Sequence, residues 1–167
     1  MTDATIEQLE NKDWGEPNYP SHLVTECHRL RRKPIDEFTV EELRIMIGQN
    51  IGFRFLLPRA MDILRDTPVA AGDFFEGDLL LAVTKCEPLQ DDQAVALRNE
   101  VRAICSNALS ELPRVSRDEI EESHGGRPPE EMGLTKQAVE LQVQERAEQM
   151  LAETPWREFN DFLKDNP

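Results

Sequence analysis

The sequence lacks the features that mark several large classes of protein. Its three cysteines, Cys27, Cys86 and Cys105, are widely spaced and include no CxxC pair, which argues against a disulfide framework and predicts reduced thiols. No run approaches the ~18 apolar residues of a membrane span, and the first residues are acidic with no apolar signal segment. We therefore expect a cytoplasmic protein that makes no membrane contact.

The fingerprints of common catalytic sites are also missing. The chain contains no GxGxxG, no P-loop, no GxSxG and no HExxH, so a nucleotide, hydrolase or zinc-protease site has no recognisable motif. A zinc site on His22, Cys27 and His28 would need a fourth ligand that is not in ligand spacing. Cys105 falls on the apolar face of a predicted helix, which suits a core residue better than a nucleophile. We predict no catalytic residue, no cofactor and no bound metal.

Positive charge is scarce relative to negative charge. The chain has 19 Lys and Arg against 33 Asp and Glu, for a net charge of −14. Such a surface repels phosphate backbones and attracts basic partners, so direct binding to nucleic acid is not expected. Two interpretations remain open: the acidity only keeps the protein soluble, or it complements a basic partner.

The sequence contains enough apolar residues to form a hydrophobic core. Hydrophobic residues make up 39% of the 167-residue chain, and a chain of this length buries roughly 70% of its unfolded surface on folding. We see no internal repeat. The apolar positions recur mostly with helical spacing, so we predict one all-α domain over residues 1–167, with about five to seven helices.

The strongest local signal is a capping box at Thr39 and Glu42, which predicts a helix that begins at Val40. Gly48 and Gly52 follow on one helical face, where each glycine costs about 1 kcal/mol relative to alanine. Either another helix crosses closely at this face, or one glycine ends the helix as a left-handed cap. The glycine cost favours a break between two helices.

Elsewhere the pattern predicts an N-terminal arm over 1–21, docked by Trp14 and Tyr19. The apolar periodicity predicts helices over 22–32, 53–67, 79–83, 91–112 and 135–153, although an apolar run as short as 79–83 also fits a strand. Asp78 is the expected cap of the helix at 79–83, and a mobile loop is expected near 113–133 because this segment is rich in charge, Gly and Pro. The expected buried positions of the C-terminal helix are Ala138, Leu141, Ala147 and Leu151, and a final helical turn carries Trp156, Phe159 and Phe162.

Two runs of the sequence resemble a known family. They are LRRKPIDEFTVEELRIMIGQNIGFRFLLPRAMDIL and TPVAAGDFFEGDLLLAV, preceded by WGEPNYPSHLVTECHRL. This part, about residues 6–86, resembles the immunity proteins of bacterial contact-dependent growth inhibition (CDI) systems, whereas the helical part over 91–167 carries no matching motif. The resemblance implies a non-catalytic cytoplasmic protein that binds the toxic C-terminal domain of a delivered effector, and many such toxins are nucleases.

The resemblance leads to a division of roles among the residues. Fold positions in the motif are Leu43, Ile47, Gly48, Gly52, Gly77 and Leu80. The predicted toxin-binding residues are exposed carboxylates outside the motif, namely Asp91, Asp92, Asp118, Glu119, Glu121, Glu122, Glu130 and Glu131. They would occlude a basic toxin surface; alternatively, they form only a solvated face. The oligomeric state is left open.

Two other functions remain as alternatives. Asp73, Glu76 and Asp78 could bind a hard cation and make the protein a small metal-dependent or acid-base enzyme, although these carboxylates serve equally well in turns and caps. The protein could also be a helical adaptor whose helix from Thr135 onward pairs with a partner helix.

Overall fold

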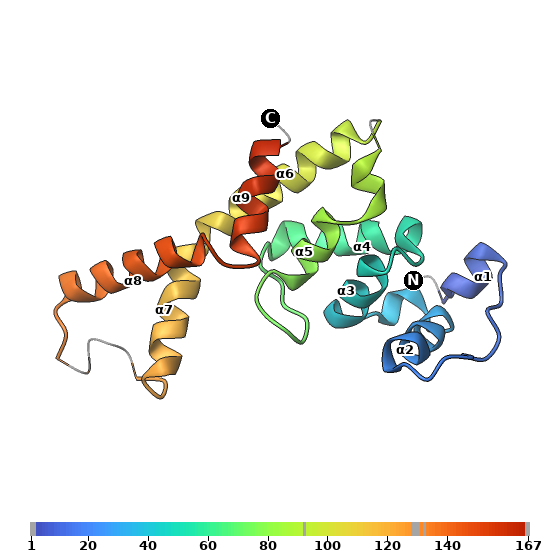
Figure 1. The fold of residues 1–167 in the computed structure, drawn as a ribbon, viewed down its shortest axis with the longest axis horizontal. Helices are drawn as coiled ribbons and strands as arrows, with labels where there is room; N and C mark the ends of the chain where they lie inside the picture. The colour runs from blue at the N-terminus through green and yellow to red at the C-terminus, as the bar shows by residue number, and fades with distance from the viewer. Residues whose placement is uncertain (1–2, 92, 128–130, 132, 166–167) are drawn as a thin grey trace. The chain divides into compact units, whose positions relative to one another are not determined.

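The computed structural model describes residues 3–91, 93–127, 131 and 133–165, and this part of the chain is helical (Figure 1). It holds nine α-helices and two short 3-10 helices, and its one β-type pairing is an isolated bridge between Thr5 and Pro34. The all-α prediction is confirmed, with more helices than the five to seven expected. None of the described helices is long and apolar enough to cross a membrane.

The chain divides into two compact units, Met1–Val101 and Arg102–Pro167, which we call the first and second unit. A single domain over the whole chain stays a prediction. The first unit holds α1 (Ile6–Glu10), α2 (His22–Arg31), η1 (Ile35–Glu37), α3 (Val40–Gly48), α4 (Phe53–Asp66), α5 (Asp78–Thr84), η2 (Glu87–Gln90) and the start of α6 (Val95–Ser110). The second unit holds the rest of α6, then α7 (Leu112–Ser123), α8 (Lys136–Met150) and α9 (Trp156–Asp165).

Helix α3 is the centre of the first unit. It contacts α2, α4 and α5, and α4 also contacts α5. Helices α3, α4 and α5 therefore lie next to one another in Figure 1. One stripe of α3, Leu43, Met46 and Ile47, is fully buried, as expected for a helix with apolar residues three and four positions apart. The other fully buried side chains of this core include Ile6, Leu30, Leu56, Leu64, Leu79 and Leu80.

The predicted capping box sets the start of α3. The Thr39 hydroxyl accepts the N–H of Glu42 (3.3 Å), and the Glu42 carboxylate accepts the N–H of Thr39 (2.8 Å). The same carboxylate binds the ammonium of Lys33 (2.6 Å) and the guanidinium of Arg29 (2.8 Å). Burial alone would raise the pKa of Glu42, but these hydrogen bonds outweigh it and lower the pKa to about 2.

Acid is therefore expected to weaken the fold through Glu42. Between pH 4.5 and about 2, the Glu42 carboxylate is protonated in the unfolded chain but stays ionised in the folded chain. Its contribution to stability is therefore complete above pH 4.5 and is lost as the pH falls towards 2. At 1.36 kcal/mol per pKa unit the contribution is about 3 kcal/mol. In urea titrations from pH 7 to pH 3, Glu42→Gln should lower stability at pH 7 by an amount of this order and flatten its pH dependence. The exposed Glu37, changed to Gln, is the control and should leave both unchanged.

The fold requires a glycine at only one of two nearby positions, Gly48 at the end of α3 and Gly52 before α4. The helix ends at Gly48, and α4 begins after Gly52, so the predicted break is confirmed. Gly52 has a left-handed backbone (φ 62°), and a Cβ there would lie 2.7 Å from Cδ1 of the buried Ile6. Gly48 needs no special backbone, and a Cβ there would meet Cβ of Ala82 at 4.0 Å, an ordinary contact. Gly52 is a fold residue as predicted, whereas Gly48 is not required by the fold.

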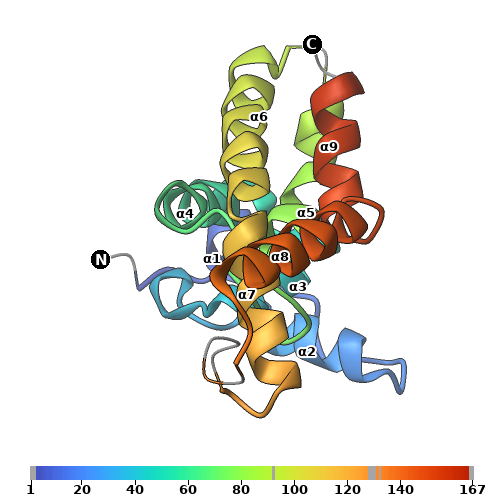
Figure 2. The ribbon, with the colours of Figure 1, turned by 90° about the vertical axis from the view of Figure 1, so that its left-hand side faces the viewer.

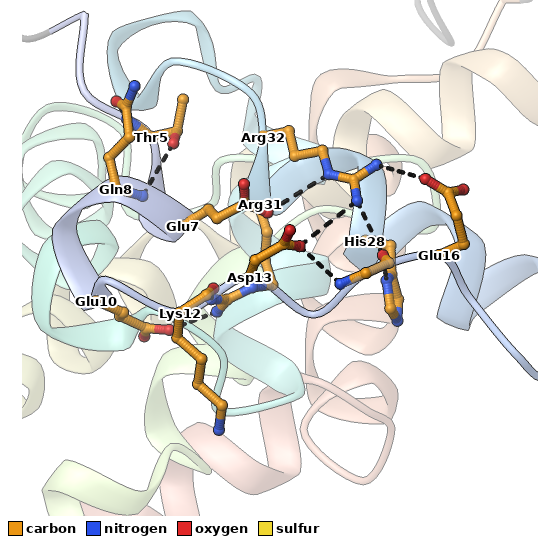
Figure 3. A network of polar contacts seen from close by, with 11 residues as sticks. Thr5, Glu7, Gln8, Glu10, Lys12, Asp13, Glu16, His28, Arg31 and Arg32 are labelled. Atoms are coloured by element: carbon orange, nitrogen blue, oxygen red, sulfur yellow. Dashed lines mark hydrogen bonds and ion pairs between the residues drawn. The ribbon is translucent and has the colours of Figure 1, made fainter.

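The N-terminal arm is held by a buried arginine of α2 (Figure 3). Arg31 is 1% exposed, pairs with Glu10 and donates to the carbonyl oxygen of Lys12 (2.7 Å). Its guanidinium carbon lies 4.2 Å from the centre of the Trp14 ring, a cation–π arrangement. Trp14 therefore docks the arm as predicted. Tyr19 is 66% exposed, so its predicted docking role is wrong.

The second unit corrects two predictions from the sequence. Helix α7 occupies the first half of the segment 113–133 that we predicted as a loop, because its residues Leu112, Val115 and Ser116 are buried and it contacts α8 (Figures 1 and 2). Helix α8 lies where it was predicted but buries a different stripe, Val139, Val143 and Met150. The predicted face is wrong at Leu141 and Leu151, which are exposed, whereas Ala138 and Ala147 are half-buried.

Helix α9 follows its sequence pattern. Trp156 and Phe159 are buried and stack edge to face, with ring centres 5.9 Å apart, and Phe162 is half-buried. Within the second unit, Arg102 donates to the carbonyl oxygen of Leu163 near the end of α9 (3.0 Å). The predicted final turn is thus confirmed as a full helix.

Candidate functional site

The loop between α4 and α5 presents two adjacent phenylalanines to solvent. We call residues 72–78, with the sequence GDFFEGD, the Phe74 loop. Phe74 is 69% exposed and Phe75 is 40% exposed. Both side chains are large and apolar, and a soluble monomer gains nothing from leaving a contiguous apolar surface in water. The two rings are therefore the first candidates for a contact with another molecule.

The carboxylate of Asp78, the first residue of α5, holds the loop in place. Its side chain is 3% exposed, and its carboxylate accepts the N–H of Gly72 (2.6 Å) and of Phe74 (3.3 Å). Arg44 balances its charge at 3.7 Å. The prediction that Asp78 caps α5 is wrong: the cap position belongs to Gly77 (φ 86°), and the carboxylate instead satisfies donors of the preceding loop.

A second carboxylate ties the loop to α3. Glu41 accepts the N–H of Asp73 (3.0 Å) and forms two hydrogen bonds with Arg44, each 2.6 Å long. The hydrogen bond from Arg44 is the main reason that the pKa of Glu41 lies below its usual value, with burial acting in the opposite sense. The Arg44 guanidinium also lies over the Phe74 ring, 4.5 Å from its centre. The exposed ring therefore rests on a fixed charged support.

A pocket of about 260 Å³ opens beside the two rings. Phe74, Phe75, Leu81 and Ala82 line it, together with the bare backbone of Gly48. Arg44, Gln49, Asp78 and Lys85 complete the lining, so charged and polar side chains share it with the apolar ones. The volume lies below the roughly 300–1,000 Å³ of sites for small molecules, so the pocket suits a side chain of another protein better than a metabolite.

The alternative sites from the sequence do not gather as metal centres. Across the described ranges, no three His, Cys, Asp or Glu side chains are grouped so that they could hold a metal ion. Asp78 is committed to backbone donors, and His28 lies 3.1 Å from the carbonyl oxygen of Gly15. All three cysteines are free thiols in buried positions. Burial raises their pKa values, that of Cys105 to about 12, so Cys105 is a core residue as predicted.

The predicted toxin-binding carboxylates lie in both units. Asp91 is in the first unit, directly after η2, where its carboxylate accepts the N–H of Gln93 (2.9 Å). Four are on α7 and one follows it, namely Asp118, Glu119, Glu121, Glu122 and Glu131. Asp92 and Glu130 lie outside the described residues.

Arginines partly balance the carboxylates of α7. Asp118 pairs with Arg114 (2.6 Å) and Glu119 with Arg146 of α8 (2.8 Å). Glu122 is exposed and Glu121 half-buried. The second unit thus brings four of the eight predicted residues onto one helix. Their role in binding stays a prediction.

Comparison with protein families decides what kind of protein carries this site. Residues 8–104 match a family model described as CDI immunity proteins. The chain belongs to this family. The resemblance over 6–86 is confirmed and extends further, and the role that membership assigns is neutralisation of a CDI toxin. No curated protein and no solved structure matches the immunity protein.

The match also changes the weight of the candidate residues in the immunity protein. It includes the Phe74 loop, whereas the carboxylates of α7 lie beyond its end at residue 104. The sequence pattern placed Gly77 of the loop among the fold positions and suggested Asp73, Glu76 and Asp78 as an alternative cation site, but it did not single out Phe74 and Phe75. The available signal was two adjacent large apolar residues between acidic residues and glycines, in a segment that otherwise has the composition of a turn.

Proposed function

We propose that this immunity protein neutralises a nuclease toxin by binding its toxic domain one to one and covering the surface that holds the nucleic acid. A nuclease is cationic where it binds phosphates, and an acidic protein can occupy such a surface by charge complementarity. The observation that carries the proposal is the family match over residues 8–104 in a chain with a net charge of −14.

The distribution of charge supports this proposal. Residues 1–101 contain 19 acidic and 11 basic side chains, and residues 102–167 contain 14 and 8, so each unit has an acidic excess. The basic run near the end of α2 is already neutralised: Arg29 and Lys33 pair with Glu42, Arg31 with Glu10 and Arg32 with Glu16. It therefore offers no free patch for phosphates.

The proposed contacts on this surface are the predicted carboxylates. Those of α7, Asp118, Glu119, Glu121 and Glu122, follow one another along one helix. Charges at the edge of an interface act mainly on the association rate, because they steer the encounter of the two proteins. Their removal should therefore slow binding more than it speeds dissociation.

The test is kinetic and uses the toxin domain encoded next to the immunity gene. We expect a tight one-to-one complex whose association rate falls steeply between 50 and 500 mM NaCl, conditions chosen to span weak and strong screening. Asp118→Lys combined with Glu122→Lys should lower the association rate by about tenfold at low salt. The matched control is Glu145→Lys on α8, an exposed acidic residue outside the predicted set, which should change the rate much less.

Two outcomes would contradict the proposal. If the neighbouring toxin domain forms no complex with the immunity protein at moderate salt, this protein does not neutralise it by binding. If a complex forms but its association rate does not depend on salt, the acidic surface is not what recognises the toxin. Protection of nuclease substrate in a cleavage assay provides the functional readout, and it should saturate at one equivalent of immunity protein.

A further inference from the structure

The Phe74 loop is built as a fixed platform for exposed apolar side chains. It projects between α4 and α5 (Figure 1), and three backbone N–H groups of the loop, those of Gly72, Asp73 and Phe74, are bound by the carboxylates of Asp78 and Glu41. The carboxylate of Asp78 is buried and that of Glu41 half-buried, so these hydrogen bonds fix the conformation of the loop. Preorganised apolar side chains bind with little loss of conformational entropy.

Gly48 is a second sign of an approaching molecule. It ends α3 with an ordinary helical backbone, and the space where its Cβ would be is open towards the pocket. The folded monomer provides no reason for a glycine at this position, since alanine would favour the helix and fit without a clash. A partner that lies close against the backbone would provide that reason, because any side chain at residue 48 would occupy part of the pocket.

The residues beside the rings indicate the chemistry of the partner. Asp73 and Glu76 flank the Phe pair in sequence, and Asp73 is exposed. Arg44 and Lys85 lie on the pocket side of the rings, and the exposed carboxylate of Asp73 lies next to Phe74 in the sequence. The rings therefore complement an apolar patch of a cationic nuclease domain, with a Lys or Arg of that domain placed against Asp73. Hot spots of protein interfaces combine central aromatic anchors with polar surroundings in the same way.

Resting on the proposed function, we propose that the Phe74 loop is the apolar anchor of the complex with the cognate toxin domain. Phe74 and Phe75 pack on an apolar patch of the toxin that has basic residues at its edge, and one toxin side chain enters the pocket beside Gly48. The carboxylates of the acidic surface bring the two proteins together, and the anchor holds them.

The two roles differ in kinetics, so they can be tested separately. Phe74→Ala combined with Phe75→Ala should raise the dissociation rate from the toxin domain by about 100-fold, since loss of aromatic anchors acts on dissociation. The association rate and its salt dependence should remain close to wild type. Tyr19→Ala is the matched control, because Tyr19 is an exposed aromatic outside the loop, and it should leave both rates unchanged.

A second variant blocks the pocket without removing a ring. Gly48→Leu should fill the space beside Phe75 and weaken toxin binding by at least about tenfold, whereas Gly48→Ala should weaken it less. Thermal unfolding should show that all variants are folded, because Phe74, Phe75 and Gly48 are exposed.

Three results would overturn the proposal. If wild type binds the toxin and the double Phe variant binds equally well, the anchor is wrong while the proposed function stands. If wild type is a dimer that the double variant dissociates, with toxin binding unchanged, the rings serve a second copy of this chain instead. If wild type binds no toxin at all, the proposed function fails and the anchor fails with it.

Discussion

Asp78→Ala is expected to lower the free energy of unfolding by about 2–4 kcal/mol, because two backbone donors of the loop lose their common acceptor. The substitution leaves the N–H groups of Gly72 and Phe74 without an acceptor. It also removes a charge 3.7 Å from Arg44, which keeps its two hydrogen bonds to Glu41. A buried donor with no partner costs about 1–3 kcal/mol on its own. The loop should lose its fixed conformation together with this stability.

The measurement is urea unfolding at neutral pH, with Asp73→Ala as the control. Asp73 is exposed and lies in the same loop. It donates its backbone N–H to Glu41, and its carboxylate acts on Arg44 only as a nearby charge, so its loss should stay within about 0.5 kcal/mol. Asp78→Asn should fall between the two, because its amide can accept from one loop N–H and not from both. Equal stability of Asp78→Ala and wild type would show that the loop is not held in this way.

The Asp78 result also bears on the enzyme alternative. If Asp78 were a catalytic carboxylate, its loss would abolish an activity and leave stability nearly unchanged. A hydrogen-bonded structural role predicts the reverse. Loss of stability without loss of any metal affinity would remove the reason to consider Asp73, Glu76 and Asp78 as a site.

Alanine is expected to act differently at Gly52, before α4, and at Gly48, the last residue of α3. Gly52→Ala should destabilise the protein by about 2–4 kcal/mol, since the left-handed backbone costs an L-residue about 1–2 kcal/mol and overpacking adds about 1–3 kcal/mol. The new Cβ would lie within 3.0 Å of three atoms of the Ile6 side chain, and Ile6 is fully buried. Helix α1 would have to move.

Gly48→Ala should instead leave stability unchanged or raise it by up to about 1 kcal/mol, the difference between alanine and glycine in a helix. The pair forms an internal control, because the two substitutions add the same methyl group four residues apart. Thermal and urea unfolding measure both. A destabilising Gly48→Ala would mean that the fold itself needs this glycine, so that no partner would be required to explain it.

Local signals in the sequence proved reliable where the chemistry is local. The capping box of Thr39 and Glu42 needs three residues and their own backbone, so nothing distant can override it. The break at Gly48 and Gly52 follows from the glycine cost in helices, and the burial of Cys105 follows from its position on an apolar stripe. These features were predicted as the structure has them.

Features that depend on a neighbouring helix were missed. Helix α7 has a polar sequence, and its packing against α8 is what buries Leu112 and Val115. In α8 the alanines and leucines suggested one face, but the helix buries Val139 and Val143. Periodicity shows that a helix has an apolar stripe, but a helix with two candidate stripes needs a partner to select one.

The sequence by itself determined the helical class, the capped start of α3, the break after it and membership of the CDI immunity family, because each rests on residue types at short fixed spacings. The tertiary structure decided which glycine the fold requires, that Asp78 serves a loop and not a helix cap, and that Phe74 and Phe75 face solvent beside a pocket. These depend on which atoms from distant segments meet, such as Ile6 against Gly52 or Glu41 against Asp73. Residue order along the chain does not encode that proximity in any local pattern.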